Sequence, residues 1–381
     1  MRGLLTRLPS VSSHTRFVFN CGLFNRALSS STKFRNMVEK LEDLPDISKI
    51  SASVTRILGQ NPGKFTLQGT NTYVIGTQHP YVLLDPGEGK QEYLPLLSSA
   101  LDALSSNTNT LPEVSDIMIS HWHSDHVGGL PSVLSLLQSR WQSRNPTTPL
   151  SSYPAPKLHK YPLPSDVAGP ASTAHNKLPE IIESLPKGAF TPTPDGKPFH
   201  DLHDNQLFRA SSPAIRVIHS PGHTLDSIAL DIPDDHALYT ADTVLGQGTA
   251  IFEDLRLYLQ SLNKLLEYGK KAPEGYQTLY PAHGPIVKSG HELISTYIKH
   301  RLDREQQVLE VLRTKPTEGD AWTTWTIVKV LYASYPESLW IPASHSIDLH
   351  LKKLQDEGTV VFLGGEGVEK AWKLDCESPS S

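Results

Sequence analysis

Short apolar runs separated by turn residues dominate the chain after residue 50. The runs SVTRILG (53–59), NTYVIG (71–76) and YVLLD (81–85) are β-rich, and turn-forming stretches such as NPGK and QGTN separate them. The leucines of LPLLSSALDAL (94–104) have helical spacing, and so do those of LPSVLSLLQSRW (130–141). Between them, DIMIS (116–120) leads directly into a histidine-rich stretch. This order predicts an α/β fold with a polar loop at the carboxyl end of a strand, where such folds place their chemistry.

A second half with the same character follows residue 213. It contains the strand-like runs AIRVIHS (214–220), SIALDI (227–232), HALYTAD (236–242) and TLYPAHG (278–284), with a helical pattern in DLRLYLQSLNKLLEYG (254–269). Residues 291–314 predict a long amphipathic helix. Further helices at about 321–334 and 344–357, followed by TVVFLGG and KAWKLD around a glycine-rich turn, predict a small winged-helix-like module. Such modules often bind nucleic acid, but on this acidic chain packing against neighbours is favoured.

The stretch 141–200 interrupts this pattern. It holds 12 of the 30 prolines, many serines and threonines, and little periodicity. It is interpreted as an irregular insertion with one short helix around KLPEIIESL (177–185), forming a surface loop; the alternative is that it borders the active site. The expected organisation is therefore a catalytic domain over 50–290 with this insertion, and a C-terminal helical and winged-helix-like region over 291–375.

The first 38 residues have a different composition. They are rich in serine, contain no acidic residue, and carry six basic ones: Arg2, Arg7, Arg16, Arg26, Lys33 and Arg35. This composition is typical of a mitochondrial transit segment and predicts a matrix location, with a cytosolic form possible by initiation at Met37. The alternative is a basic tail that targets nothing. Removing six positive charges from a chain of net charge −5 leaves −11, which gives no general reason to bind nucleic acid.

The remaining bulk properties exclude other classes. A length of 381 residues suits one large domain or a domain plus a small one, and 38% hydrophobic residues allow a real core. No apolar stretch is long enough for a transmembrane helix, so no membrane is expected as a partner. The two cysteines, Cys21 and Cys376, lie at opposite ends and form neither a disulfide framework nor a thiolate metal site.

The stretch SHWHSDHVGG (120–129) concentrates candidate metal ligands. Imidazole nitrogen and carboxylate oxygen suit zinc, iron or manganese, and His121, His123, Asp125 and His126 offer four such donors within six positions. A loop can direct the first two to one metal and the last two to another, while Gly128 and Gly129 permit close backbone approach. The alternative is a hydrogen-bonded cluster of structural histidines. Four donors at this spacing favour metal binding over that alternative.

Three further donors follow β-rich runs: His223 in HSPGHT, Asp242 in YTAD and His283 in YPAHG. Each is flanked by small or turn-forming residues, as ligand loops at strand ends require. Individually they are weak signals, but in this order they strengthen the first motif. The pattern HWHSDH, then PGH, then an aspartate and a histidine after strands, resembles the metallo-β-lactamase superfamily.

That resemblance implies an αββα sandwich with a two-metal site, most simply two Zn²⁺ ions, with manganese or iron as alternatives. Carried over residue by residue, His121, His123 and His223 would bind the first metal, and Asp125, His126 and His283 the second. Asp242 would bridge them. Two departures are present: Pro86 follows Asp85 where the superfamily usually has threonine, and Ser227 in GHTLDS replaces a histidine of the closest group. The second puts any proton-transfer role of that position in doubt.

The resemblance is closer to one group. ILGQNPGKFTLQGTNTYVIG, IFEDL (251–255), YIKHRLDREQQ and HLKKLQDEG look like the beta-lactamase-like protein 2 group, over about residues 53–375. That group implies a mitochondrial single-strand endoribonuclease with a C-terminal winged-helix-like piece. The fungal acyl-carrier-protein thioesterases share the opening motifs.

The expected activity is hydrolysis with a metal-bound hydroxide, because two metals lower the pKa of bound water and stabilise a developing oxyanion. Asp125 could handle the proton. The best interpretation is a single-strand endoribonuclease, with single-stranded RNA as substrate. The alternatives are a thioesterase acting on acyl-carrier-protein or glutathione-type thioesters, and a non-catalytic RNA- or protein-binding relative. The oligomeric state is not predicted.

Other residues receive structural interpretations. Trp122 is expected to pack beside the ligand loop, and Asp85 to fix that loop without binding metal. A salt-bridged helix face is expected from His300, Arg301 and Arg304, with Asp303 and Glu305 nearby. The alternative is that the two arginines contact a substrate phosphate. Trp322, Trp325 and Trp340 are expected in the core of the tail module.

Overall fold

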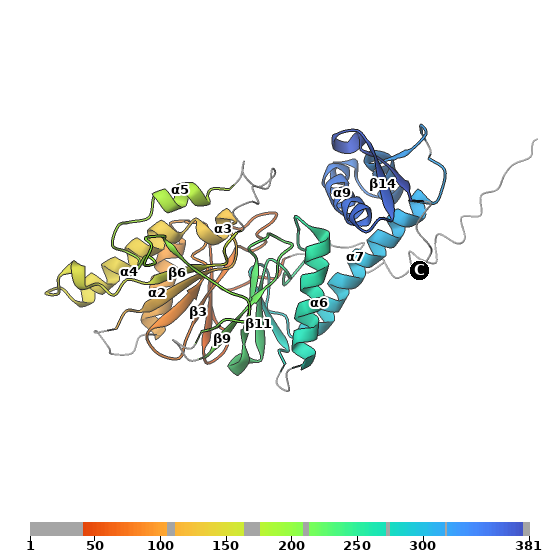
Figure 1. Ribbon diagram of the computed structural model, residues 1–381. Helices are drawn as coiled ribbons and strands as arrows, with labels where there is room; N and C mark the ends of the chain where they lie inside the picture. Colours follow the sequence, from red (N-terminus) through yellow and green to blue (C-terminus); the bar gives the residue numbers. More distant parts are fainter. Residues whose placement is uncertain are drawn as a thin grey trace, which may run out of the picture. The chain divides into compact units, whose positions relative to one another are not determined.

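A computed structural model describes residues 41–104, 111–163, 176–208, 213–271, 275–316 and 318–375 (Figure 1). The predicted transit segment lies outside these residues. Among the described residues, no helix is long and apolar enough to cross a membrane.

Seven strands form the first sheet in chain order. The pairs from β1 to β4 are antiparallel, and those from β4 to β7 are parallel. Parallel neighbours need a crossover connection, which α2 (Tyr93–Leu104) and α4 (Leu130–Arg144) provide after β4 and β5. The strands are β1 (Ile47–Lys49), β2 (Val54–Leu58), β3 (Asn71–Ile75), β4 (Tyr81–Leu84), β5 (Val114–Ile119), β6 (Lys157–Lys160) and β7 (Phe199–Asp201).

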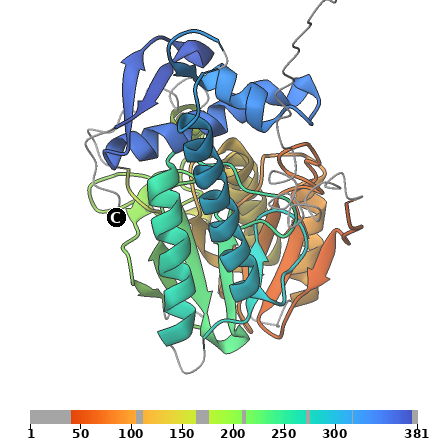
Figure 2. The same ribbon diagram turned by 90° about the vertical axis from the view of Figure 1, so that its right-hand side faces the viewer.

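Five strands form the second sheet, in the order β12-β11-β10-β9-β8. All neighbours are antiparallel except β11 and β12, which α6 (Leu255–Lys271) connects. Figure 2 shows α6 and α7 (Gly290–Leu312) lying side by side along this sheet. The strands are β8 (Leu207–Phe208), β9 (Ile215–His219), β10 (Ile228–Ile232), β11 (Ala237–Ala241) and β12 (Thr278–Pro281).

Alternating side chains build the layers of the core. In β3, Tyr73 and Ile75 join the hydrophobic cluster between the two sheets, whereas Val74 joins the cluster under α2 and α4. In the second sheet, Leu230 faces the first sheet and Ala229 faces α6 and α7. Because successive side chains of a strand point to opposite faces, strands covered on both sides are apolar throughout. The layers are therefore helix, sheet, sheet and helix, and the predicted αββα sandwich is confirmed.

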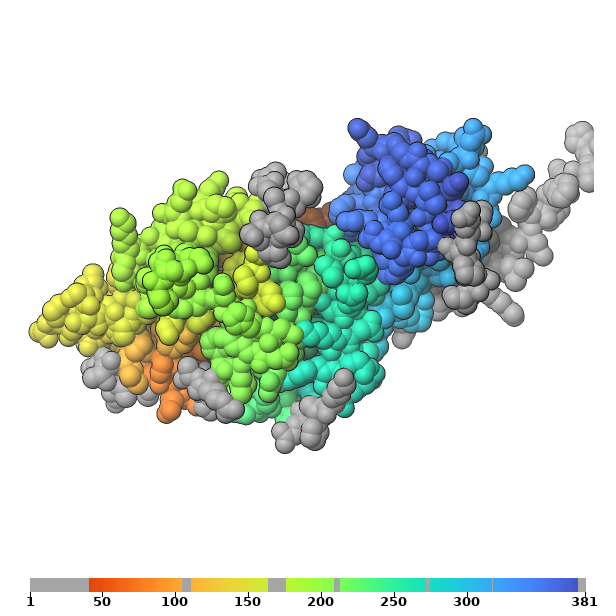
Figure 3. Space-filling model, viewed as in Figure 1, coloured from red at the N-terminus to blue at the C-terminus, as the bar shows by residue number. Residues whose placement is uncertain are grey.

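The interpretation of 141–200 as an irregular insertion is wrong. The segment supplies β6 and β7, two parallel strands of the first sheet, together with the expected short helix α5 (Leu178–Glu183). Proline-rich turns flank the two strands, whose sequences KLHK and FHD are short and contain no apolar run that would mark them as strands. Figure 3 shows the part around α5 on the surface of the molecule. A 3-10 turn (Leu150–Ser152) precedes β6.

The C-terminal module has the helices and hairpin of a winged helix. Strand β13 (Trp322–Thr323) pairs with β15 (Ala371–Leu374), which pairs with β14 (Val360–Gly364). Helix α8 (Thr324–Leu331) begins with a reciprocal capping box between Thr323 and Thr326, and α9 (Trp340–Asp356) follows after a 3-10 turn (Glu337–Leu339). The module shares a hydrophobic cluster with the end of α7, which includes Val308 and Leu312. Trp322 is buried there as expected, and Trp340 packs against that cluster.

Candidate metal centre

Four loops at the carboxyl ends of strands bring the seven predicted donors together. The segment after β5 carries His121 and His123 and then the one-turn helix α3 (Ser124–Val127), which holds Asp125 and His126. The segments after β9, β11 and β12 carry His223, Asp242 and His283. These donors form two groups, and in each group the candidate ligand atoms lie within 4.8 Å of one another.

Three imidazoles of the first group face one another. The distances are 3.0 Å from His121 Nε2 to His123 Nδ1, 3.1 Å from His121 Nε2 to His223 Nε2, and 3.0 Å from His123 Nδ1 to His223 Nε2. His223 Nδ1 donates to the Ile251 carbonyl at 2.7 Å, so a neutral His223 directs its Nε2 lone pair at the other two rings. Two nitrogens bound tetrahedrally to one zinc ion lie about 3.3 Å apart. The triangle therefore has the dimensions of three ligands facing one cation.

Asp242 lies between the two groups. Its Oδ2 is 3.6 Å from His223 Nε2, and its Oδ1 is 3.2 Å from His283 Nε2 and 3.5 Å from His126 Nε2. Asp125 Oδ2 completes the second group, 3.1 Å from His126 Nε2 and 3.3 Å from His283 Nε2. One carboxylate oxygen thus faces each group, as a bridging ligand requires.

The polar atoms of this cluster do not satisfy one another. His126 Nε2 and Asp242 Oδ1 are buried and make no hydrogen bond. Buried polar atoms without a partner are rare and need an explanation such as an ion. Together with the nitrogen and oxygen donors, these atoms fit two divalent metals better than a structural cluster of hydrogen-bonded histidines.

The pKa values differ between the two groups. Burial lowers the pKa of His121 far below its usual range and that of His123 to about 3, so both imidazoles are neutral, as metal ligation requires. For His283, burial opposes protonation, but the carboxylates of Asp242 and Asp125 outweigh it and raise the pKa to about 9. The pKa of His126 rises in the same way. Metal entering the second group would therefore displace protons from these two residues.

Asp85 supports the ligand loop without belonging to either group. Its Oδ2 lies 2.8 Å from His126 Nδ1 and accepts hydrogen bonds from the hydroxyls of Ser120 at 2.7 Å and Tyr239 at 2.6 Å. Its Oδ1 accepts from the Ser120 amide at 2.8 Å. Both the orientation of His126 and the start of the loop thus depend on one buried carboxylate. The backbone of Asp85 has φ +53°, an uncommon value for a residue other than glycine.

Two glycines let the ligand loop pack directly on the segment after β4. A Cβ at Gly129 would lie 2.0 Å from the Pro86 carbonyl oxygen, and one at Gly128 would lie 2.6 Å from that of Glu88. Neither position has room for a side chain. The close backbone approach expected from the paired glycines is therefore present.

Sequence reasoning missed two contacts that position ligands. Thr70 Oγ1 donates to Asp125 Oδ2 at 2.9 Å, and the backbone of Thr70 pairs with that of His283. On the other side, the Ile251 carbonyl holds His223 Nδ1. A backbone carbonyl has no signal in the sequence, and a threonine after a turn is too common to attract notice.

Arg301 does not lie on a salt-bridged surface, and that prediction is wrong. Its side chain is buried, its Nη2 donates to the Ala250 carbonyl at 2.9 Å, and its guanidinium lies 4.8 Å from the centre of the Phe252 ring. Asp303 pairs with Lys299 instead. Amphipathic spacing places a residue on a helix face but cannot reveal that a loop covers that face. Arg301 therefore anchors Ala250. The next residue in the chain is Ile251, whose carbonyl accepts the hydrogen bond from His223.

The turn after His223 is fixed from within. Ser227 Oγ accepts a hydrogen bond from the Thr224 amide at 3.1 Å, and Asp226 forms a buried ion pair with Lys160 at the end of β6. Ser227 therefore has a structural role in this turn. Trp122 packs as expected, with its ring centre 4.4 Å from that of His123.

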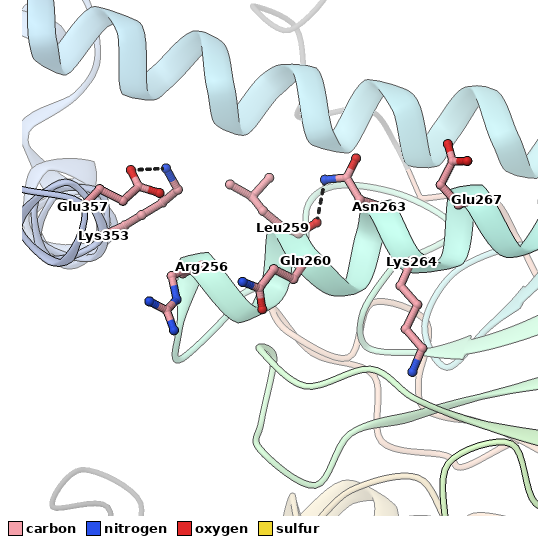
Figure 4. Close-up of a pocket in the computed structure, with 8 residues that line it drawn as sticks. All are labelled: Arg256, Leu259, Gln260, Asn263, Lys264, Glu267, Lys353 and Glu357. Atoms are coloured by element: carbon pink, nitrogen blue, oxygen red, sulfur yellow. Dashed lines mark hydrogen bonds and ion pairs between the residues drawn. The ribbon is translucent and has the colours of Figure 1, made fainter. Parts of the chain in front are cut away.

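A separate groove lies between α6 and the C-terminal end of α9 (Figure 4). Its volume is about 740 Å³, and Lys353 pairs with Glu357 on its α9 side. None of the seven donors lines it. The lining residues are Arg256, Leu259, Gln260, Asn263, Lys264, Glu267, Lys353 and Glu357.

Comparison with known proteins follows the two parts of the fold. The family profile of the metallo-beta-lactamase superfamily matches residues 65–283, and that of the beta-lactamase associated winged helix domain matches residues 323–372. Among curated proteins, the chain is 33% identical to a beta-lactamase-like protein 2 homolog of Drosophila melanogaster, over 83% of this chain and 92% of that protein. It is 30% identical to an atrochrysone carboxyl ACP thioesterase of Aspergillus novofumigatus, over 84% of each chain.

Solved structures agree in fold. A beta-lactamase domain protein from Burkholderia ambifaria superposes with a TM-score of 0.62 at 19% identity, covering 89% of this chain and 96% of that one. A metallo-beta-lactamase family protein from Thermus thermophilus gives a TM-score of 0.55 at 17% identity, covering 86% and 100%. The predicted resemblance is confirmed: the chain belongs to the metallo-beta-lactamase superfamily, whose members are generally metal-dependent hydrolases, and carries the associated winged helix domain.

Proposed function

We propose that the chain is a two-metal hydrolase that cleaves single-stranded RNA internally. The proposal of a hydrolase rests on the complete set of seven donors, in which one Asp242 oxygen faces each group. The choice of RNA is supported by similarity to beta-lactamase-like protein 2 homologs over most of the chain. The resemblance to that group implies endoribonuclease activity.

The proposed ligand roles follow the two groups. His121, His123 and His223 would hold the first metal, Asp125, His126 and His283 the second, and Asp242 both. Zinc suits these nitrogen and oxygen donors, and manganese and iron also accept them. Bound metals would lower the pKa of a water and offset the negative charge that develops on the substrate.

Asp125 has a second proposed role as proton acceptor. Burial raises the pKa of its carboxyl, but the neighbouring charges of His126 and His283 lower it more, so the carboxylate is ionised. Thr70 holds one of its oxygens. An ionised and fixed carboxylate beside the reacting centre can take the proton of the attacking water.

A thioesterase is the second candidate, because several relatives of this chain are named as thioesterases. Atrochrysone carboxyl ACP thioesterases from three fungi are 28–30% identical to this chain over 84–88% of its length. The same donor set serves thioesters and phosphodiesters, because both reactions develop negative charge on oxygen.

One assay separates the two candidates. The full chain, loaded with zinc, would be assayed side by side on a single-stranded RNA and on an acyl-carrier-protein thioester. RNA cleavage that disappears in His123→Ala supports the ribonuclease. Thioester turnover with intact RNA reverses the order.

We also propose that the chain acts in the mitochondrial matrix, because residues 1–38 are basic and free of acidic residues. A fluorescent fusion at the C-terminus should co-localise with a matrix marker. The same fusion starting at Met37 should remain in the cytosol, and matrix import of that shorter form would contradict the proposal.

A further inference from the structure

We infer that the tip of the loop between β2 and β3 is a nucleobase subsite of the candidate centre. In this subsite Phe65 stacks on a base of the RNA, and Lys64 pairs with a neighbouring phosphate. The inference rests on the proposed ribonuclease function. It assigns RNA binding to two residues that are not among the proposed metal ligands.

The loop is tied internally, so its tip is presented in a defined conformation. The Gly59 amide donates to the Thr70 carbonyl at 2.7 Å, which closes the base of the loop. Nearer the tip, the Gly63 amide donates to the Leu67 carbonyl at 3.0 Å, and Thr66 Oγ1 donates to the Asn61 carbonyl at 2.6 Å. A side chain on such a loop can bind a ligand with little loss of conformational freedom.

The base of the loop is joined directly to the candidate metal centre. Thr70 contacts Asp125 through its hydroxyl and His283 through its backbone, so it touches two members of the second group. Phe65 is five residues from Thr70, and five extended residues span at most about 18 Å. The tip therefore lies within a few nucleotides of a bond held at the centre.

Phe65 is exposed without a structural reason. At 65% exposure it is the most exposed large hydrophobic side chain among the described residues, and it belongs to none of their hydrophobic clusters. Lys64 Nζ lies 5.5 Å from the centre of the Phe65 ring and makes no ion pair with another described residue. An exposed aromatic ring next to a cation without an ion-pair partner is the combination by which proteins bind single-stranded nucleic acid.

The same features fit an acyl chain poorly. An acyl chain needs a concave site that removes most of its surface from water, whereas a single exposed ring beside a charge offers one flat face. Stacking also needs an aromatic ring, while contact with an acyl chain needs only an apolar side chain. Substitution of Phe65 can therefore distinguish the two ligands.

The test compares Phe65→Trp, Phe65→Leu and Phe65→Ala in the zinc-loaded full chain, with Leu150→Ala as control. Leu150 is 50% exposed and lies beyond α4, outside the donor loops. Loss of base stacking should raise KM for single-stranded RNA about 5- to 150-fold in the leucine and alanine variants. Phe65→Trp and Leu150→Ala should retain the wild-type KM. Zinc content should be equal in all of them.

Lys64→Ala supplies an independent readout. Loss of one phosphate contact should reduce the slope of log KM against log salt concentration by about 0.7. Lys49→Ala, at the end of β1 opposite Thr55 and away from the loop, should leave the slope unchanged.

Two failures are distinguishable. If the wild type cleaves RNA and Phe65→Leu has an unchanged KM, the stacking subsite is wrong while the proposed function stands. If the wild type leaves RNA intact and turns over a thioester equally well with leucine at position 65, the proposed function fails and the inference fails with it.

Discussion

His126 uses its two ring nitrogens differently. Its Nε2 faces Asp125 in the candidate centre, and its Nδ1 contacts Asp85. A carboxylate on the far nitrogen fixes the orientation of a ligating imidazole and increases its basicity. The same carboxylate also receives two hydrogen bonds from Ser120 and one from Tyr239. Asp85, which is not one of the seven candidate donors, thus orients one of them.

Asp85→Asn should weaken metal binding while the fold persists. The amide keeps the shape of the side chain but removes the charge that orients His126, and loss of such a partner typically costs roughly 10- to 100-fold in affinity. Competition with a chromophoric chelator measures the effect, with the exposed Asp43→Asn as control. An affinity equal to that of the wild type would show that His126 does not depend on Asp85.

At the residue scale, the sequence was enough to identify the seven residues that cluster in the structure, but not the residues that support them. Histidine and aspartate after apolar runs are visible as residue types at strand ends, and all seven lie together in the structure. The Ile251 carbonyl that holds His223 is a backbone atom that every residue possesses. Such a contact becomes visible only when the segments have been placed in space.

At the scale of elements, α7 connects the C-terminal module to the ligand loops. Arg301 on this helix binds the Ala250 carbonyl, next to the residue that holds His223. One turn further on, Glu305 pairs with Lys353 of α9 at 2.9 Å. One helix therefore contacts both the loop beside the metal centre and the winged helix.

Arg301→Met should loosen the loop that carries Ile251. Methionine fills much of the same volume but loses the hydrogen bond to Ala250 and the contact of the charge with Phe252. The expected loss is about 1–3 kcal/mol in the free energy of unfolding, accompanied by weaker zinc binding. Urea unfolding and zinc titration measure both, and Arg313→Met, exposed at the end of the same helix, is the control. A lower free energy of unfolding without any change in zinc affinity would show that Arg301 contributes to stability alone.

Glu305→Gln should lower stability in a pH-dependent way. Burial raises the pKa of Glu305, but the nearby His350 and the hydrogen bond from Lys353 lower it more, so the folded pKa lies below the unfolded value. The ionised form therefore stabilises the fold above the unfolded pKa of about 4.3, and this stabilisation is lost as the pH falls through the folded pKa.

The difference in melting temperature between wild type and Glu305→Gln should thus be largest near neutral pH and should shrink below about pH 4. Glu310→Gln on the same helix, which makes no ion pair among the described residues, serves as control. A difference that stays constant with pH would contradict an electrostatic origin.

Element prediction succeeded where apolar residues formed a clear run or had helical spacing, and it failed for β6 and β7, which are short and largely polar. The spacing of apolar residues was sufficient for α4, α6 and α7, which have 15, 17 and 23 residues. Strands β6 and β7 have four and three residues, and their place in the sheet depends on the pairing of β6 with β5 and of β7 with β6 rather than on local pattern. Pairing between distant segments is not readable from one segment alone.

At the scale of the whole molecule, the two sheets and the winged helix follow from residue patterns, but the substrate does not. The donor set needs only a bond whose hydrolysis develops negative charge on oxygen, and both RNA and thioesters meet that need. Net charge does not decide between them, because an acidic body repels an RNA and an acidic carrier protein alike. The choice of substrate therefore depends on residues such as Phe65, which belong neither to the hydrophobic core nor to the seven candidate donors.

The central claim is that seven residues hold two metals that perform hydrolysis together. Its most direct test is metal content measured in parallel with activity on the full chain, by elemental analysis of wild type and His123→Ala. We expect two metals per wild-type chain, and a lower metal content with no hydrolysis in the variant. Full hydrolytic activity with fewer than one metal per chain would contradict it.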